Sequence, residues 1–396
     1  MEIFERILEM TSLEELINQP GYLLMILISL LLLFLGIVKK YEPLLLVPIG
    51  FGVLIANIPE SNLGVVKVDD SAGLLEIARK HGIINFIYYS LIKTGFLPPL
   101  IFMGVGALTD FGPMLKNLRL VFFGAAAQLG IFTVLILASL MGFSDKEAAS
   151  LAIIGGADGP TAIYTSIILA PHLLGPIAIA AYSYMALVPV IIPLVVKFTI
   201  SKKELLINMK KLDDTHSDNY EIKNIGTIKI IFPIVMTIIV SLIVPSSTPL
   251  IGFLMFGNLI KEIGSTTIRL SKAISDNILN SSTVFLGLCI GATMTPDSFL
   301  NIQTLGIIIG GLFAFVISIF GGIVAVKIVN VFVKKKINPL IGATGLSAVP
   351  MASRVANEIA LKNDSSNHIM HYAMASNISG VIGSAVAAGI LITFFG

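Results

Sequence analysis

The chain has 396 residues, of which 55% are hydrophobic and 13% are charged. A soluble domain usually carries about 25% charged residues, so this composition excludes a soluble globular protein and indicates a polytopic membrane protein. The net charge of +2 gives no electrostatic basis for nucleic-acid binding, and the single cysteine, Cys289, excludes a disulfide framework.

The N-terminal segment 1–19 is rich in acidic side chains. It contains the glutamates Glu2, Glu5, Glu9, Glu14 and Glu15. Because the start of a secretory signal peptide is basic rather than acidic, this segment is predicted to be a short amphipathic helix on the membrane surface.

Apolar segments that can span a membrane follow along the whole chain. The predicted spans are 22–38, 43–58, 96–109, 119–142, 174–198, 227–245, 248–260, 282–294, 304–333 and 369–395. Two further stretches, 149–170 and 338–361, hold too many helix-breaking residues for simple spans and are predicted to be re-entrant hairpins or discontinuous helices. The polar stretch 59–81 is expected to lie on the outer side of the membrane and to carry a small helix around Ala72 to His81.

Basic residues suggest an orientation. They cluster at Lys39 and Lys40, at Lys116 and Arg119, at Lys197, Lys202 and Lys203, at Lys261, and at Lys334, Lys335 and Lys336. These clusters share one side of the membrane if each span crosses once and both hairpins return to their own side, and the positive-inside rule makes that side cytoplasmic. The predicted divisions are a membrane repeat at 1–198, a cytoplasmic linker at 199–226 and a second membrane repeat at 227–396.

Three motifs of the first half recur in the second half, in the same order and at nearly constant spacing. GADGPTAI at 156–163 aligns with GATGLSAV at 342–349. The Gly-Ala pair at 106–107 recurs at 291–292, and the YMA run at 184–186 recurs as AMA at 373–375. Three ordered matches at almost the same offset indicate an internal repeat.

Five spans and one hairpin in each half force the halves into opposite orientations. The predicted fold is therefore an all-α polytopic membrane protein with an inverted-topology repeat, and each half has about five spanning helices and one broken re-entrant hairpin. In such proteins ions bind near the bilayer midplane, where the broken helices of the two halves meet.

Asp158 lies in the middle of the first hairpin, flanked by glycines and a proline that unwind the helix. An ionisable residue at this depth costs roughly 3 kcal/mol or more, so it usually serves an ion, a partner or a cavity. One carboxylate among hydroxyls and carbonyls suits a monovalent hard cation such as Na+, since a divalent site would gather more carboxylates. The simpler alternative is a carboxylate that caps the start of a helix.

The second hairpin supplies oxygen atoms without charge, from Asn338, Thr344, Ser347 and the backbone around Gly342. As the repeat mate of the Asp158 loop, it is expected to complete the ion site. Small residues of this kind also serve helix packing in membranes, which is the alternative.

Arg354 follows Ser347 by seven residues, or two helical turns, so both side chains can share one helix face. A guanidinium would repel a nearby cation unless it serves another purpose, and bidentate contact with the carboxylate of a substrate is the obvious one. In the alternative interpretation, Arg354 snorkels to the cytoplasmic interface.

Tyr182 and Tyr184 lie in one predicted span, on different faces of the helix. Tyr184 coincides with the repeat and is the expected proton donor or wall of the site, whereas a tyrosine that only satisfies its own hydroxyl is the alternative. Ser376 and Asn377, in the partner span, are further candidate ion ligands. No HExxH, GxSxG, Walker or dinucleotide-binding motif occurs in the sequence.

Long motifs connect the chain to a known family. They are GGADGPTAIY (155–164), AYSYMAL (181–187), NPLIG (338–342), SAVPMASR (347–354) and VIGSAVAAG (381–389). Over essentially its whole length the sequence resembles the β subunits of the sodium-pumping, biotin-dependent decarboxylases, which act on oxaloacetate, methylmalonyl-CoA or glutaconyl-CoA.

The resemblance implies an enzyme subunit in the cytoplasmic membrane of a prokaryote. A soluble carboxyltransferase α subunit transfers a carboxyl group to biotin on a carrier subunit, and the carboxybiotin loses CO2 at the membrane chain. This reaction consumes a proton and drives Na+ outward. The implied cofactors are Na+ and biotin, the latter attached to the carrier. The implied partners are these two subunits, a small membrane subunit of the γ or δ type, and further copies of the chain.

The resemblance also implies roles for single residues, with Asp158 as the Na+-linked carboxylate and Tyr184 as the proton-linked hydroxyl. The residues implied as catalytic are Asp158, Tyr184 and Arg354. Those implied for Na+ are Asp158, Asn338, Gly342 and Ser347, and those implied for carboxybiotin are Ser347 and Arg354.

Two other functions are compatible with parts of the pattern. A stand-alone Na+-coupled transporter, either a carboxylate symporter or a Na+/H+ antiporter, would use inverted repeats and broken helices equally well and would need no partners. A non-catalytic membrane anchor is disfavoured, because an anchor has no reason to bury Asp158 and Arg354.

Overall fold

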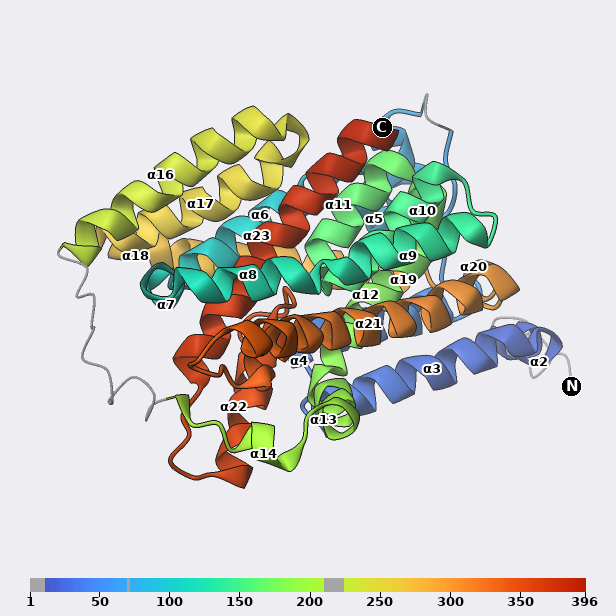
Figure 1. Cartoon of the computed structure of the whole chain (residues 1–396). Coiled ribbons are helices and arrows are strands. Elements are labelled where there is room, and N and C mark those ends of the chain that lie inside the picture. Colours follow the sequence, from blue (N-terminus) through green and yellow to red (C-terminus); the bar gives the residue numbers. More distant parts are fainter. Residues whose placement is uncertain (1–10, 70–71, 210–223) are drawn as a thin grey trace, which may run out of the picture.

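The computed structural model describes residues 11–69, 72–209 and 224–396, without the side chain of Ala186. Every regular element in these ranges is a helix, and they contain no strand (Figure 1). The all-α class predicted from the sequence is confirmed. The predicted surface helix at 1–19 lies partly outside the described residues, and its described part is the short helix α2 (Leu13–Asn18).

The first half contains a series of helices interrupted at several points. They are α3 (Pro20–Ile37), α4 (Pro43–Ala56), α5 (Leu74–Ile87) with the π-helical η1 (Tyr88–Ile92), α6 (Leu97–Leu108), α7 (Gly112–Lys116), α8 (Leu118–Ala127), α9 (Leu129–Leu140), α10 (Asp145–Ala152), the 3-10 helix η2 (Ile153–Gly156), α11 (Gly159–Leu169), η3 (Pro171–Leu173), α12 (Leu174–Ala186) and α13 (Val188–Thr199).

The second half begins after the short helix α14 (Lys202–Leu205) and the rest of the predicted linker. Its helices are α16 (Ile225–Ile243), η4 (Pro245–Ser247), α17 (Thr248–Ile263), α18 (Ile268–Lys272) with the π-helical η5 (Ala273–Ile278), α19 (Leu279–Ala292), α20 (Pro296–Phe299), α21 (Ile302–Phe332), the 3-10 helix η6 (Pro339–Thr344), α22 (Met351–Asn363) and α23 (Met370–Phe395).

Six of the described helices are long and apolar enough to cross a membrane, and the number rises to eight if each of two bent pairs forms one span. The bent pairs are α5–η1 with α6, at an angle of 69°, and η3–α12 with α13, at 67°. These lengths and compositions support the predicted multi-pass membrane protein.

One predicted boundary is wrong, and one helical segment was not predicted. The small helix predicted to end at His81 is interrupted there, at Gly82 with non-helical φ and ψ angles, but helical structure resumes after it and continues through η1 to Ile92. In the second half, α18 and η5 carry helical structure from Ile268, well before the predicted start at 282. A π-helical turn is present in both places, in η1 and in η5. The second passes directly into α19, whereas a bend of 69° separates η1 from α6.

The first broken stretch folds back on itself. Ser144 caps α10, and Glu147 in its first turn lies 2.8 Å from the Nε2 atom of His172, just beyond the end of α11. Because the start of α10 and the end of α11 meet in this contact, the two helices form a hairpin whose tip is η2 and the residues around Asp158.

Glycines allow two helix pairs to approach closely. Helix α4 packs against α19 at Gly52 and Gly291, and α17 packs against α6 at Gly257 and Gly106. A Cβ atom on Gly52 would lie 2.3 Å from a backbone oxygen of α19, and one on Gly257 would lie 1.9 Å from a backbone oxygen of α6. Only glycine fits at such crossings, as is common in helix pairs within membranes.

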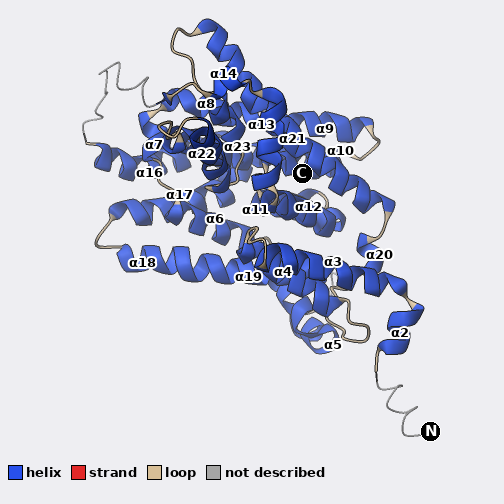
Figure 2. Cartoon of the chain, turned by 90° about the horizontal axis from the view of Figure 1, so that it is seen from below, coloured by secondary structure: helices blue, strands red, loops and turns tan. Residues whose placement is uncertain are grey.

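The two broken stretches meet in the interior of the molecule. In Figure 2, α18, α19, α4 and α3 lie along one side, α8, α21 and α9 lie along the other, and α11 and α12 lie between them. The tip η2 contacts α9, α21 and α23, while η6 contacts α21, α22 and α23. Both broken stretches therefore contact the same two long helices, α21 and α23.

Candidate functional site

Asp158 is the N-cap residue of α11. Ala157 before it adopts a left-handed conformation with φ of 54°, and Pro160 after it occupies the first turn of the helix. The chain therefore breaks at Ala157 and restarts at Gly159, which leaves the Asp158 carboxylate at the positive end of the α11 dipole. The backbone N–H of Thr161 donates to Oδ1 at 3.1 Å, and the residue is 5% exposed.

Two serine hydroxyls complete the environment of the Asp158 carboxylate. Ser347 Oγ donates to Oδ2 at 2.6 Å, and Ser384 Oγ donates to the same atom at 2.7 Å. Ser347 comes from the loop after η6, and its backbone N–H also donates to the Gly156 carbonyl at 3.1 Å. Ser384 comes from α23, so three segments, two of them from the second half, converge on one carboxylate.

Asp158, Ser347 and Ser384 all offer oxygen as the ligand atom. In the described part of the chain, no group of three or more His, Cys, Asp or Glu side chains could hold a metal ion. A site with one carboxylate and neutral oxygens matches a monovalent hard cation better than a transition metal or a divalent ion.

The other expected ligands of the second hairpin face different partners. Asn338 Nδ2 donates to the carbonyls of Leu205 and Ile207, at 3.2 and 2.9 Å. Gly342 lies against α21, where a Cβ atom on it would come within 2.1 Å of the Gly322 carbonyl oxygen. The hydrogen bonds of Asn338 thus fix the hairpin to the segment after α14, and Gly342 allows η6 to approach α21.

Arg354 is exposed in the first turn of α22. The expectation that Ser347 and Arg354 share a helix face is wrong, because α22 begins only at Met351 and Ser347 lies in the loop before it. Ser347 therefore points to Asp158 while Arg354 faces the surface.

The two tyrosines of α12 point in different directions, as their spacing predicted. The Tyr184 hydroxyl donates to the backbone carbonyl of Ile308 in α21. Tyr182 lies over the start of α11, where a Cβ atom on Gly159 would be 2.4 Å from its Cε1 atom. Tyr182 is thus the tyrosine beside Asp158.

Asn377 and Ser376 lie close to the second hairpin. Asn377 Nδ2 donates to the Leu346 carbonyl, and its Oδ1 accepts from Ser353 Oγ at 3.2 Å. Ser376 Oγ is buried and has no hydrogen-bond partner among the described residues. Asn377 therefore holds the loop that positions Ser347 instead of contacting Asp158 itself.

Ser384 is a residue of the candidate site that the sequence did not lead us to expect. It lies in the VIGSAVAAG run and follows Asn377 by seven residues, or two helical turns. That spacing places both side chains on the face of α23 that meets the hairpins, and it is the signal that could have identified Ser384.

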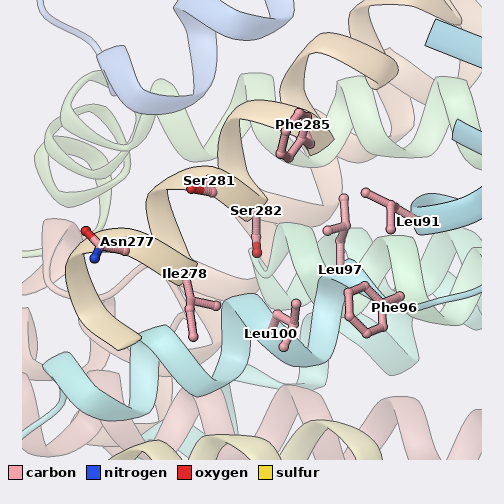
Figure 3. Close-up of a pocket in the computed structure, with 9 residues that line it drawn as sticks. All are labelled: Leu91, Phe96, Leu97, Leu100, Asn277, Ile278, Ser281, Ser282 and Phe285. Carbon is pink, nitrogen blue, oxygen red and sulfur yellow. The ribbon is translucent and has the colours of Figure 1, made fainter. Parts of the chain in front are cut away.

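A groove in the surface is separate from this site. It has a volume of about 310 Å³ and lies between α6 and the η5–α19 segment (Figure 3). Its lining residues are Leu91, Phe96, Leu97, Leu100, Asn277, Ile278, Ser281, Ser282 and Phe285. No charged side chain is among these lining residues.

Comparisons with known proteins agree with the motifs. The family model described as the Na+-transporting oxaloacetate decarboxylase beta subunit matches residues 21–395. The oxaloacetate decarboxylase beta chain of Klebsiella pneumoniae is 43% identical, in an alignment that covers 94% of this chain and 95% of the relative.

Two relatives carry a different substrate in their names. The methylmalonyl-CoA decarboxylase subunit beta of Propionigenium modestum is 45% identical, with 95% of each chain covered. The corresponding subunit of Veillonella parvula is 44% identical, with 96% of this chain and 97% of the relative covered. The chain therefore belongs to the family of Na+-transporting oxaloacetate decarboxylase beta subunits.

Proposed function

We propose that this chain is the membrane subunit of a decarboxylase sodium pump, which decarboxylates carboxybiotin on a carrier subunit, consumes a proton and drives Na+ export. The observation that carries the proposal is the buried Asp158 carboxylate, bound by Ser347 and Ser384 from the other half of the chain. Family membership supplies the reaction, and the carboxylate supplies a place where Na+ can bind within the membrane.

The hydroxyls of Ser347 and Ser384 can stabilise the site both with and without a bound Na+. Without a cation they donate to the carboxylate, and with Na+ bound they turn their lone pairs toward the ion while the carboxylate neutralises its charge. Na+ bound here disfavours protons on neighbouring acid groups by electrostatic repulsion, which couples ion binding to proton delivery toward the biotin. Decarboxylation needs this proton at the ureido nitrogen.

Arg354 is proposed to hold the carboxylate of carboxybiotin. Its exposed position in α22 is reachable by a biotin arm from a soluble carrier, and a guanidinium binds a carboxylate through two parallel hydrogen bonds. Tyr184 is proposed as the proton-linked hydroxyl on the basis of the YSYMAL motif. In that role it would exchange its bond to Ile308 during the cycle.

We further infer that the halves 1–198 and 227–396, joined by 199–226, form an inverted repeat. The π-helical turns Tyr88–Ile92 and Ala273–Ile278 support this interpretation, since each precedes the helix that carries the recurring Gly-Ala pair. Helix α4 packs against α19, and α17 packs against α6. If α17 is the repeat mate of α4, and α19 that of α6, the two contacts are related by the repeat.

Two asparagines follow the same symmetry. Asn57 Nδ2 donates to the Met294 carbonyl at 2.7 Å, and Asn258 Nδ2 donates to the Thr109 carbonyl at 2.8 Å. The two acceptors are separated along the chain by the same spacing as the recurring Gly-Ala pair. Both asparagines thus join the end of one helix to its partner from the other half.

The assembly is proposed to contain a biotin carrier, a carboxyltransferase α subunit, a small γ- or δ-type membrane subunit and several copies of this chain, in the cytoplasmic membrane of a prokaryote. The relatives named above are subunits of enzymes for oxaloacetate and for methylmalonyl-CoA. The soluble carboxyltransferase selects between such substrates, and the membrane chain receives carboxybiotin in each case.

The proposal is tested with the purified chain in detergent and a biotin carrier that has been carboxylated beforehand. Release of CO2 is measured with Na+ and with the same concentration of K+. Faster release in Na+ is the expected result. No release at any Na+ concentration, together with Na+ transport by the chain alone in vesicles, would instead establish a stand-alone transporter.

A further inference from the structure

Tyr182 carries a hydroxyl that is buried and unpartnered. The residue is 1% exposed, and its Oη atom has no hydrogen-bond partner among the described residues. A hydroxyl in this position has lost its bonds to water on folding without gaining others, which destabilises the protein. A buried polar atom of this kind in a native interior indicates a ligand that completes it.

The hydroxyl is directed at the start of α11. A Cβ atom on Gly159 would lie 2.4 Å from Tyr182 Cε1 and 2.5 Å from Cζ, the atom that bears the hydroxyl. Gly159 directly follows Asp158, and the two side chains are close enough to interact electrostatically. The tip of the tyrosine ring therefore lies beside the carboxylate, and glycine at 159 provides the space for it.

The ring alone does not explain a tyrosine at this position. It packs in an apolar cluster that includes Ile163, Leu174 and Ala178. A phenylalanine would fill the same space without burying an unsatisfied oxygen. The hydroxyl therefore needs a function of its own.

We propose that the Tyr182 hydroxyl oxygen is a Na+ ligand in the Asp158 site. It contributes a neutral oxygen from α12 to a set that otherwise comes from the two hairpins and α23, namely Asp158, Ser347 and Ser384. Hard cations are bound by such oxygens, and each added ligand replaces a water that the buried ion has lost. This inference rests on the proposed Na+ site, because it names a further ligand of it.

This assignment gives Tyr182 and Tyr184 different roles. Residues two positions apart on an α-helix lie about 200° apart around its axis, so Tyr182 and Tyr184 cannot face the same site. Tyr182 faces the Asp158 carboxylate, while the Tyr184 hydroxyl donates to the Ile308 carbonyl in α21. Helix α12 thereby connects the Na+ site on one side with the long helix α21 on the other.

The test uses the full chain in detergent, with NaCl as the ligand and KCl at equal ionic strength as the reference. The midpoint of thermal unfolding is titrated with Na+ to obtain an apparent affinity. Tyr182→Phe removes only the hydroxyl and is expected to raise the Na+ concentration for half-maximal stabilisation by roughly ten-fold or more, as losses around metal sites do. Its unfolding midpoint in K+ is expected to stay equal to that of the wild type, or to rise.

Two variants make the result specific. Tyr164→Phe removes another tyrosine hydroxyl, from a half-buried ring on α11 that lies beside Gly95, and should leave the Na+ affinity unchanged. Asp158→Asn should abolish the Na+ response. Wild-type affinity in Tyr182→Phe, together with loss in Asp158→Asn, overturns the Tyr182 assignment and leaves the site in place. A wild-type chain that does not respond to Na+ overturns the site itself.

A structure of the wild-type chain provides a test that does not depend on the variant folding. With Tl+ in place of Na+, the heavier ion is visible by its scattering. The proposal requires a peak within direct coordination distance of both Asp158 and Tyr182 Oη. A peak bound by Asp158 and the two serines, with Tyr182 outside coordination distance, overturns it.

Discussion

At the scale of single residues, the charge of Asp158 can be separated from its role in capping α11. Asparagine is as good an N-cap as aspartate and can accept the same bond from the Thr161 N–H. We therefore expect Asp158→Asn to fold with a stability within about 1 kcal/mol of the wild type. Na+-dependent CO2 release should fall to the level seen in K+, because the neutral amide cannot balance a buried cation.

The measurement is CO2 release from carboxylated biotin carrier, with the unfolding midpoint in K+ as the control for folding. If Asp158→Asn retained the Na+-dependent rate, the carboxylate would be a structural cap and the Na+ site would lie elsewhere.

Ser384 should contribute both to stability and to Na+ affinity. Its hydroxyl bonds a buried carboxylate, and such bonds are worth about 1.5–3 kcal/mol. Ser384→Ala is expected to lower the free energy of unfolding by an amount in this range and to raise the Na+ requirement of decarboxylation. The measurements are denaturant unfolding and a Na+ titration of the rate.

Ser379→Ala is the matched control on the same helix. The Ser379 hydroxyl donates to the Val121 carbonyl at 2.6 Å and does not touch Asp158. This variant should lose stability without a change in Na+ requirement. Equal Na+ titrations for the two variants would contradict a role for Ser384 in the site.

The sequence could predict part of the candidate site. Asp158 and Ser347 were identifiable, because a charge among helix breakers and the second hairpin, the repeat mate of its loop, point to the same place. In the structure Ser347 Oγ lies 2.6 Å from Asp158 Oδ2. The second partner, Ser384, could have been identified only from its spacing of two helical turns from Asn377, since a serine among small residues in a helix otherwise looks like packing. Asn338 was predicted at the site but bonds the segment after α14, a contact between distant parts of the chain that no local pattern encodes.

At the scale of helices, the crossing of α6 and α17 should not tolerate a methyl group. A Cβ atom on Gly106 would lie 1.9 Å from the Leu254 carbonyl oxygen, which belongs to the backbone and cannot move alone. Gly106→Ala is therefore expected to destabilise the chain by about 1–3 kcal/mol, the usual cost of overpacking. The measurement is the unfolding midpoint in detergent.

Gly252→Ala on α17 is the control for this substitution. Its Cβ atom would meet only a side-chain methyl of Thr248 at 3.9 Å, so the change should be neutral or stabilise the helix. Equal stability of the two variants would show that α6 and α17 do not pack as described.

The hydrogen bond between Glu147 and His172 should make the stability of the first hairpin sensitive to acid. Hydrogen bonds from His172 and from Ser144 lower the pKa of the Glu147 carboxyl to about 2, from an ordinary value of 4.5. The stabilisation from this lowered pKa is fully present above pH 4.5 and is lost as the pH falls toward 2. The unfolding midpoint of the wild type should therefore converge with that of Glu147→Gln over this range.

Midpoints of both proteins measured from neutral pH downwards test this expectation. If the difference in unfolding midpoint between the wild type and Glu147→Gln stayed constant through the acid range, the contribution of the Glu147 carboxylate to stability would be contradicted.

Most helices could be predicted from apolar runs, because residues that face lipid or the core must be apolar over nearly the whole length of a span. The segments that escaped prediction are the part of α5–η1 beyond His81 and the segment α18–η5. At the first of these places Gly82 interrupts the helix with φ of 78°. A π-helical turn also shifts the register, so the usual period of 3.6 residues does not continue through it.

At the scale of the whole molecule, the start of the proposed linker 199–226 is fixed to α21, in the proposed second half. Lys327 Nζ in α21 donates to the Thr199 carbonyl at 2.6 Å and to Glu204 at 3.1 Å. Asn338 binds the carbonyls just beyond, so the end of the first half lies against the hairpin of the second. The halves therefore form one structural unit around the site, and neither completes the Asp158 site without the other.

The proposed inverted repeat and orientation place particular loops on opposite sides of the membrane, and accessibility can test this directly. Lys335 follows α21 on the predicted cytoplasmic side, whereas Lys80 belongs to the region predicted to lie outside, and both residues are exposed. Cys289 is the only native cysteine and is fully buried, so it gives little background reaction with a membrane-impermeant maleimide. Lys80→Cys should therefore react in intact cells, and Lys335→Cys should react only after the membrane is opened. Reaction of both variants from the same side would exclude this topology, because the predicted spans between the two positions, from 96–109 to 304–333, are odd in number and the hairpin 149–170 returns to its own side.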